Sequence, residues 1–196
     1  MATRQEQIDF VKQVYPAAYH LYSRKDSIHP VFVTAQAALE TGWKIKGIGN
    51  NIFGITKGST WTGKTELVLT VEIFSHPNVK FALPERIVGI EALPTGKYRY
   101  RVWRQFRAYD SLEDCLDDHL NVLRGNGYAD AWPYRHDPKE FAARIVDHVG
   151  AKYATDPNYA RTMSAVIDTV RLRIKDIQNE KTVSPVDNAV FFRLQV

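Results

Sequence analysis

The hydrophobic period of this chain changes twice, and the two changes constrain its architecture more than any other feature. Apolar residues recur at helical spacing up to residue 42, and from 61 to about 74 they alternate with polar residues. Helical spacing returns at residue 111 and continues to about residue 181. This order predicts a mainly α fold with a small inserted β-hairpin lobe, which is an α+β class.

Local signals mark where the helices begin and end. Thr3 and Glu6 have the spacing of a capping box, and Gly42 and Gly125 are suited to end helices. The alternating residues 97–103 are the expected antiparallel partner of the first strand. The expected helices are residues 3–22, 30–42, 111–125, 137–150 and 156–181, and the expected strands are residues 61–74 and 97–103, while residues 87–90 and 189–194 could add short strands.

A chain of 196 residues is most simply one domain with one core. We expect it to cover residues 1–180, with the β-rich insertion at about 60–108 and a tail at 181–196. The hydrophobic fraction of 44% and the charged fraction of 24% are those of an ordinary soluble protein. The sequence has no run of about 18 apolar residues. Its single cysteine, Cys115, excludes an internal disulfide and is expected in the core.

Glu40 is the candidate catalytic residue that this pattern brings out. It falls in the last turn of the apolar helix that begins at Pro30 and stops at Gly42. The negative end of the helix dipole lies there, which disfavours a carboxylate. That field, with apolar neighbours such as Trp43, is expected to raise the pKa of Glu40 and to suit it to donate a proton. The alternative is an ordinary solvated glutamate at a frayed helix end.

Four motifs then carry a family resemblance. Residues 38–43 read Ala-Leu-Glu-Thr-Gly-Trp and residues 50–55 read Asn-Asn-Ile-Phe-Gly-Ile, and two further matches follow at 106–111 and 153–159. Together they resemble the bacterial glucosaminidases of glycoside hydrolase family 73, which include autolysins and the wall-cutting domain of flagellar rod-cap proteins. The resemblance implies a lysozyme-like fold, cleavage of peptidoglycan and no cofactor. Thr41, Ile52 and Thr56 are conservative departures from the family pattern.

The strand-like segment supplies a second carboxylate. Glu66 and Glu72 are six residues apart, so an unbroken strand projects both from one face. The opposite face is expected to pack on the core, and it carries Leu67, Leu69, Val71 and Ile73. The resemblance implies an important glutamate in this hairpin. Glu72 matches its position best, and Glu66 is the alternative, with a role in substrate binding.

The resemblance also implies further site residues. Tyr153 is the first candidate to steady the substrate's N-acetyl group or a water molecule, and Tyr159 is a second tyrosine near the substrate. Trp43, Asn51 and Phe53 are expected to shape the sugar cleft. Turn geometry explains the asparagine equally well, and Phe53 could simply belong to the core.

The resulting interpretation is an endo-β-N-acetylglucosaminidase that cuts β-1,4 bonds of peptidoglycan glycan strands. An N-acetylmuramidase or a lytic transglycosylase would use the same helix-end acid. A non-catalytic wall-binding module is a further alternative. The basic and aromatic residues at 98–104 could suggest a nucleic-acid binder, but charge alternation on an exposed strand explains them better, and no nucleic-acid partner is expected.

The six histidines show no metal-ligand spacing, so no metal is expected. The net charge of +4 favours contact with an anionic surface such as the bacterial wall. We expect a monomer that acts in the periplasm or outside the cell. The N-terminal residues lack the apolar stretch of a secretory signal. Release during phage lysis or a dedicated export machine would therefore bring the protein to the wall. The alternative is that a signal segment has been removed from this sequence.

Overall fold

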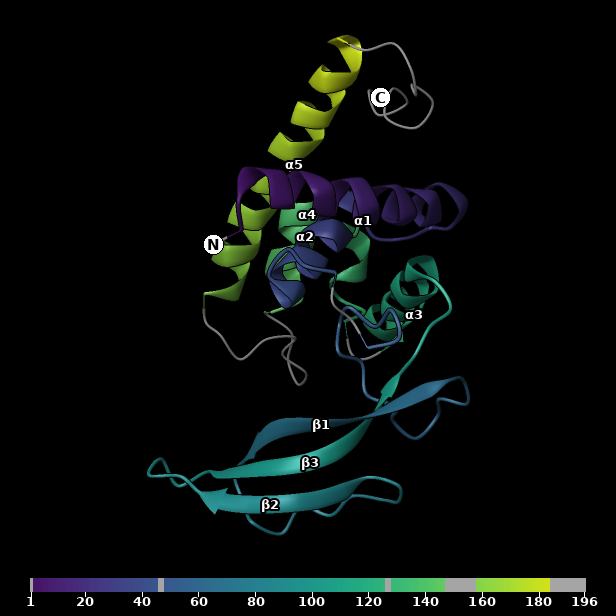
Figure 1. The fold of residues 1–196 in the computed structure, drawn as a ribbon. Helices are drawn as coiled ribbons and strands as arrows, with labels where there is room; N and C mark the ends of the chain where they lie inside the picture. The colour runs from purple at the N-terminus through teal and green to yellow at the C-terminus, as the bar shows by residue number, and fades with distance from the viewer. Residues whose placement is uncertain (1, 46–47, 126–127, 147–157, 184–196) are drawn as a thin grey trace. The chain divides into compact units, whose positions relative to one another are not determined.

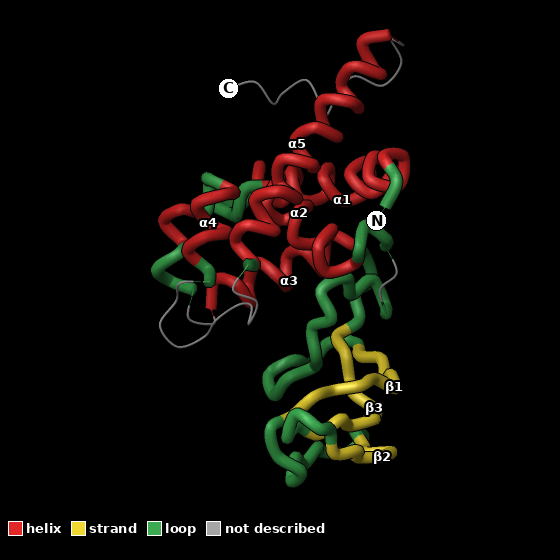
Figure 2. Tube along the Cα trace, turned by 90° about the vertical axis from the view of Figure 1, so that its left-hand side faces the viewer, coloured by secondary structure: helices red, strands yellow, loops and turns green. Residues whose placement is uncertain are grey.

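The computed structural model describes residues 2–45, 48–125, 128–146 and 158–183 (Figure 1). The chain divides into two compact units. Residues 1–46 and 111–196 form the first, which we call the helical unit, and residues 47–110 form the second, which we call the sheet unit. All described helices belong to the helical unit and all described strands to the sheet unit (Figure 2). The β-rich segment expected at 60–108 lies within the sheet unit.

Helices at the expected places build the helical unit. Thr3 caps the first of them, because its Oγ1 accepts a hydrogen bond from the Glu6 amide at 3.2 Å while the Glu6 carboxylate accepts one from the Thr3 amide at 2.7 Å. The predicted capping box is confirmed. The helices are α1 (Arg4–Arg24), α2 (Pro30–Thr41), α3 (Leu112–Gly125), α4 (Pro138–Arg144) and α5 (Tyr159–Val183), with a 3₁₀ turn at Trp132–Tyr134.

Helix α2 forms the centre of the helical unit. Every residue from 30 to 38 is buried, and the helix packs against α1, α4 and α5. A helix that is buried on all sides belongs to a core. His29 accepts a hydrogen bond from the Val31 amide at 3.2 Å, and Pro30 occupies the first turn. Gly42 ends the helix in the left-handed conformation, at φ 61°, as its position in the sequence predicted.

Helix α4 is shorter than expected. Asp137 caps it by accepting hydrogen bonds from the Lys139 and Glu140 amides at 2.9 and 3.0 Å. The prediction extended this helix to residue 150, whereas α4 ends at Arg144 and a turn follows. Residues 147–150 lie outside the described residues, and so does the strand considered at 189–194. Cys115 is a buried free cysteine in α3, as expected.

Three antiparallel strands make up the sheet. They are β1 (Thr65–Phe74), β2 (Arg86–Ala92) and β3 (Tyr98–Arg107), in the order β1-β3-β2. β1 pairs with β3 without interruption from Thr65 opposite Arg107 to Phe74 opposite Tyr98. β2 pairs with the other edge of β3 and contains an irregularity between Ile87 and Gly89. The antiparallel partner strand and the strand considered at 87–90 are both confirmed.

The structure reverses the expected faces of β1. The aliphatic row predicted to face a core is exposed, and it comprises Leu67, Leu69, Val71 and Ile73. The buried residues lie on the opposite face, where the rings of Phe74 and Phe81 pack edge-on against Tyr100 with centroids 5.1 and 6.4 Å away. Tyr100 and Val102 are completely buried there. The reason is that the segment between β1 and β2, which carries Phe81, covers this face around Glu72, whereas Glu66 stays exposed.

Candidate active site

Glu40 lies in the last turn of α2, as predicted, and it is the only exposed side chain of that helix. The predicted burial of this carboxylate in apolar surroundings is wrong. Leu39 is already half-buried, so the helix leaves the core in its final turn. The backbone amides of Gly42 and Trp43 both donate to the carbonyl of Ala38, the second at 3.1 Å, and this fixes the end of the helix. Glu40 is thus exposed, on a helix end whose backbone is fixed by these bonds.

Trp43 follows this turn with a positive φ of 67°, which is uncommon for a residue with a side chain. Its half-buried ring packs edge-on against Phe10 of α1, with centroids 5.7 Å apart. The contact packs the ring on α1. A role of Trp43 as a wall beside Glu40 stays a prediction. Stacking on a sugar stays a prediction.

Tyr159 lies at the start of α5 and is held inside the helical unit. Its side chain is only 5% exposed, and its hydroxyl accepts a hydrogen bond from the Gln36 amide nitrogen at 3.3 Å. Burial raises the pKa of Tyr159, and the negative charge of Glu40 raises it further. Gln36 and Glu40 are one helical turn apart in α2, so the structure brings Tyr159 together with Glu40. Tyr153 lies outside the described residues.

The segment before β1 is organised by Asn51. Its side-chain amide donates to the carbonyls of Ile55 and Arg107 at 2.8 and 2.9 Å, while its oxygen accepts from the Ile55 amide at 3.0 Å. Asn51 is 5% exposed, so these backbone bonds account for its amide and show it building the loop. Phe53 is half-buried in the same loop. A direct contact of either residue with substrate stays a prediction.

Gly49 precedes this loop and has no room for a side chain. Its φ is +51°, and a Cβ there would come within 2.6 Å of the Ala108 Cβ and 2.9 Å of Glu66 Oε1. The neighbouring Asn50 donates a hydrogen bond to the carbonyl of Tyr109 at 2.9 Å. The loop is therefore tied closely to the end of β3, beside Glu66.

Glu66 and Glu72 project from the same face of β1, because the strand is unbroken between them. Their surroundings differ. Glu66 is exposed, whereas Glu72 is half-buried and forms an ion pair with Arg104 of β3 at 3.4 Å. Arg104 also forms an ion pair with Glu85 at 3.0 Å and lies over the ring of Phe81 at 5.0 Å. Glu72 is thus the more buried of the two carboxylates, and Arg104 holds it within the sheet unit.

The sequence interpretation missed three residues that contact the candidate site residues. Gln36 is hydrogen-bonded to Tyr159 and to His119, and Arg104 is hydrogen-bonded to Glu72. Gln36 could have been noticed, since a glutamine in an otherwise apolar helix, four residues before Glu40, invites an explanation. His119 and Arg104 occupy ordinary positions of a helix and of a charge-alternating strand. Nothing in the sequence distinguishes them from solvated residues.

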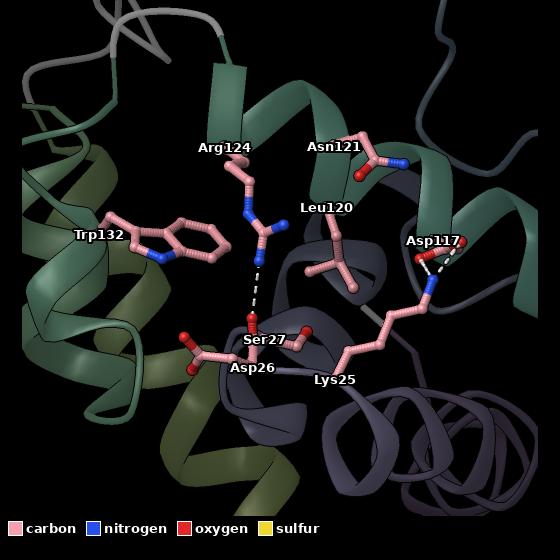
Figure 3. Close-up of a pocket in the computed structure, with 8 residues that line it drawn as sticks. All are labelled: Lys25, Asp26, Ser27, Asp117, Leu120, Asn121, Arg124 and Trp132. Atoms are coloured by element: carbon pink, nitrogen blue, oxygen red, sulfur yellow. Dashed lines mark hydrogen bonds and ion pairs between the residues drawn. The ribbon is translucent and has the colours of Figure 1, made fainter.

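A separate small cavity in the helical unit is too small for a sugar (Figure 3). Its volume of about 20 Å³ is enough for roughly one water molecule. The buried Ser27 Oγ has no hydrogen-bond partner among the described residues, so a single water there would satisfy it. An ion pair at 2.7 Å between Lys25 and Asp117 and a hydrogen bond at 2.9 Å from Arg124 to the Asp26 carbonyl border the cavity. It is a packing feature of the helical unit.

Among the described residues, no three histidine, cysteine, aspartate or glutamate side chains are grouped so that they could hold a metal ion. None of the helices described is both long enough and apolar enough to cross a membrane.

Each unit carries exposed or half-buried carboxylates, the residue type that glycosidic cleavage requires. The helices and the small antiparallel sheet are those of the lysozyme-like glycoside hydrolases. The chain belongs to the Glucosaminidase family, described as mannosyl-glycoprotein endo-beta-N-acetylglucosaminidase, whose pattern matches residues 16–172. The family and the α+β fold predicted from the sequence are therefore confirmed.

Individual relatives agree with this assignment. The peptidoglycan hydrolase FlgJ of Pseudomonas aeruginosa is 31% identical over 81% of this chain and 35% of its own length. A probable N-acetylmuramidase of Lactococcus lactis is 29% identical over 75% of this chain and 30% of its own length. The chain thus spans about a third of each of these curated relatives. The glycoside hydrolase domain of Salmonella typhimurium FlgJ superposes with a TM-score of 0.62 at 25% identity, covering 93% of this chain and 96% of that domain.

Proposed function

We propose that this chain hydrolyses β-1,4 glycosidic bonds in the glycan strands of bacterial peptidoglycan, as an endo-β-N-acetylglucosaminidase. The observation that carries the proposal is Glu40, the one exposed side chain of an otherwise buried helix, within the motif that resembles the family's Glu-Ser-Gly-Trp. Family membership and the name of the Pseudomonas relative support peptidoglycan as the substrate. The bacterial wall, in the periplasm or outside the cell, is then the place of action.

In this proposal Glu40 gives its proton to the oxygen of the leaving sugar. Glycoside cleavage also needs a group that assists attack on the opposite side of the sugar ring. Glu72 is our candidate to orient or deprotonate the attacking water. If the substrate's own acetamido group attacks instead, Tyr153 orients that group, and Glu72 contributes less to the rate.

Two neighbouring activities are separated by the sugar at the new reducing end. The Lactococcus relative bears the name N-acetylmuramidase, which favours cleavage on the other side of the same disaccharide as the second candidate. Purified peptidoglycan digested by the protein should be reduced with borohydride and examined by mass spectrometry. Reduced N-acetylglucosamine supports the proposal, reduced N-acetylmuramic acid supports a muramidase, and an anhydro sugar identifies a lytic transglycosylase.

Glu40→Gln tests the acid directly. The substitution keeps the shape and removes the proton donor, so the rate of wall solubilisation should fall by about 10²–10⁴-fold with unchanged circular dichroism. Glu180→Gln in α5 is the matched control for losing a carboxylate, and it should keep full activity. A folded Glu40→Gln protein that clears wall suspensions at a normal rate removes Glu40 from the mechanism. Binding to peptidoglycan without cleavage by the unaltered chain would identify a wall-binding module.

A further inference from the structure

Three polar side chains from three helices meet inside the apolar core of the helical unit. Gln36 of α2 is completely buried, His119 of α3 is 3% exposed and Tyr159 of α5 is 5% exposed. His119 Nε2 lies 2.8 Å from Gln36 Oε1, and Gln36 Nε2 lies 3.3 Å from the Tyr159 hydroxyl. Burying polar groups is costly unless they are hydrogen-bonded, so this chain of bonds is a fixed part of the fold.

The chain of bonds has a direction. The Gln36 amide oxygen carries no proton, so His119 must donate to it through a protonated Nε2. The Gln36 amide nitrogen can only donate, so the Tyr159 hydroxyl accepts from it. The hydroxyl proton of Tyr159 is then directed away from Gln36, as a donor to another acceptor. The opposite direction would require His119 to carry its proton on Nδ1.

His119 stays uncharged throughout the range from pH 5 to 8. Burial lowers the pKa of His119 to about 3 from an ordinary value of 6.5. The imidazole therefore stays neutral, with one donor nitrogen and one acceptor nitrogen. The hydrogen-bonded chain of His119, Gln36 and Tyr159, which we call the relay, therefore does not switch with pH in this range.

We propose that Gln36 and His119 are positioning residues that hold the Tyr159 hydroxyl as a hydrogen-bond donor on the Glu40 side of the relay. Gln36 and Glu40 are four residues apart on one face of α2, and the charge of Glu40 acts on the Tyr159 phenol. When Glu40 gives up its proton, a negative charge appears on its carboxylate. In the proposal, a hydroxyl already held as a donor stabilises that charge without having to reorganise. This inference rests on the proposed role of Glu40.

The direction of the relay can be tested without any activity. Nitrogen-15 NMR distinguishes a neutral imidazole protonated on Nε2 from one protonated on Nδ1. We expect the His119 resonances, assigned with a His119→Gln variant, to show the Nε2–H form unchanged between pH 5 and 8. An Nδ1–H form, or titration in this range, overturns the proposal even if the protein is an active hydrolase. This measurement remains informative if the protein proves inactive on peptidoglycan, which would refute the proposed function instead.

A double-mutant cycle tests whether Gln36 affects catalysis through the Tyr159 hydroxyl. Gln36→Met removes both hydrogen bonds at similar volume and should lower kcat by about 10- to 100-fold with little change in KM. In a Tyr159→Phe background it should have almost no further effect, because the hydroxyl that it positions is already gone. Thr34→Val is the control, since it removes another buried hydrogen bond of α2, the 2.8 Å bond to the Pro30 carbonyl, without touching the relay. An equal loss of kcat from Gln36→Met in both backgrounds refutes a role through Tyr159.

Further variants of Gln36 and His119 separate the direction of the hydrogen bonds from the shape of the side chains. Gln36→Glu keeps the shape but presents two acceptors, so Tyr159 would have to donate towards residue 36, and kcat should fall at least as far as in Gln36→Met. His119→Gln retains a donor and should keep most of the activity, whereas His119→Leu should not. If Gln36→Glu does not fold, the comparison between His119→Gln and His119→Leu decides. Equal kcat values in those two variants contradict the proposal.

Discussion

Lowering the pH from 7 to 5 should destabilise the helical unit, and His119 should be one of the causes. This imidazole is 3% exposed, and burial lowers its pKa to about 3. In the unfolded chain it has the ordinary value of 6.5. At a pH between these two pKa values, His119 binds a proton in the unfolded state but not in the folded state. The contribution of His119 to stability is therefore complete above pH 6.5 and is lost as the pH falls towards 3.

The size of the effect follows from the two pKa values. Linkage between them gives a loss of about 2 kcal/mol in the free energy of unfolding from pH 7 to pH 5, from this one group. Domains are typically stable by only about 5–15 kcal/mol, so the loss is large enough to measure. His29, at the start of α2, adds to it, because burial lowers its pKa to about 4.

Urea unfolding at pH 7 and at pH 5 measures the loss. Ellipticity at 222 nm reports on the helical unit, since all described helices belong to it. His119→Gln cannot take up the proton, so its loss between the two pH values should be about 2 kcal/mol smaller than that of the unaltered protein. The contribution of His29 is present in both proteins and cancels. His76→Gln, at an exposed position, should change nothing. Parallel losses in the unaltered protein and in His119→Gln refute the reasoning.

The remaining predictions concern the catalytic groups. Glu72→Gln should be severely impaired in wall solubilisation while Glu66→Gln keeps much more activity, and the reverse result would show that Glu66 is the second carboxylate. If the acetamido route operates, Tyr153→Phe should cost more than either, which steady-state rates on one peptidoglycan preparation would show. Cleavage should fall on the alkaline limb of its pH profile, because Glu40 must hold a proton to donate it. At constant ionic strength, a rate that still rises at about pH 9 would exclude that role.

The helices could be predicted because their signals are local. Thr3 and Glu6 form the expected capping box, and Gly42 stops α2 where a left-handed residue is needed. The buried stripes of α1 and α3 also follow directly from apolar spacing. Such signals require only a few neighbouring residues. The early end of α4 had no sequence signal, and the structure offers no physical reason for it.

The relay behind Glu40 could not be predicted, because its members are far apart in the chain. His119 is 83 residues from Gln36, and Tyr159 is 123 residues from it. Their meeting depends on how α2, α3 and α5 pack, and that packing is determined by apolar contacts that many sequences would satisfy equally well. A single glutamine in an apolar helix indicates that a partner must exist. It does not indicate which residue the partner is.

The two faces of β1 show why alternation alone cannot locate a site. A period of two places Glu66 and Glu72 on one face and the aliphatic row on the other, and this much is confirmed. The alternating pattern defines two faces, but it does not show which of them becomes buried. Phe81 and Glu85 decide the matter, because the segment that carries them folds over the glutamate face around Glu72. Since Glu85 also forms an ion pair with Arg104, the covering segment holds the arginine that steadies Glu72, so the order imposed on this carboxylate comes from the same contacts that bury the sheet's aromatic cluster.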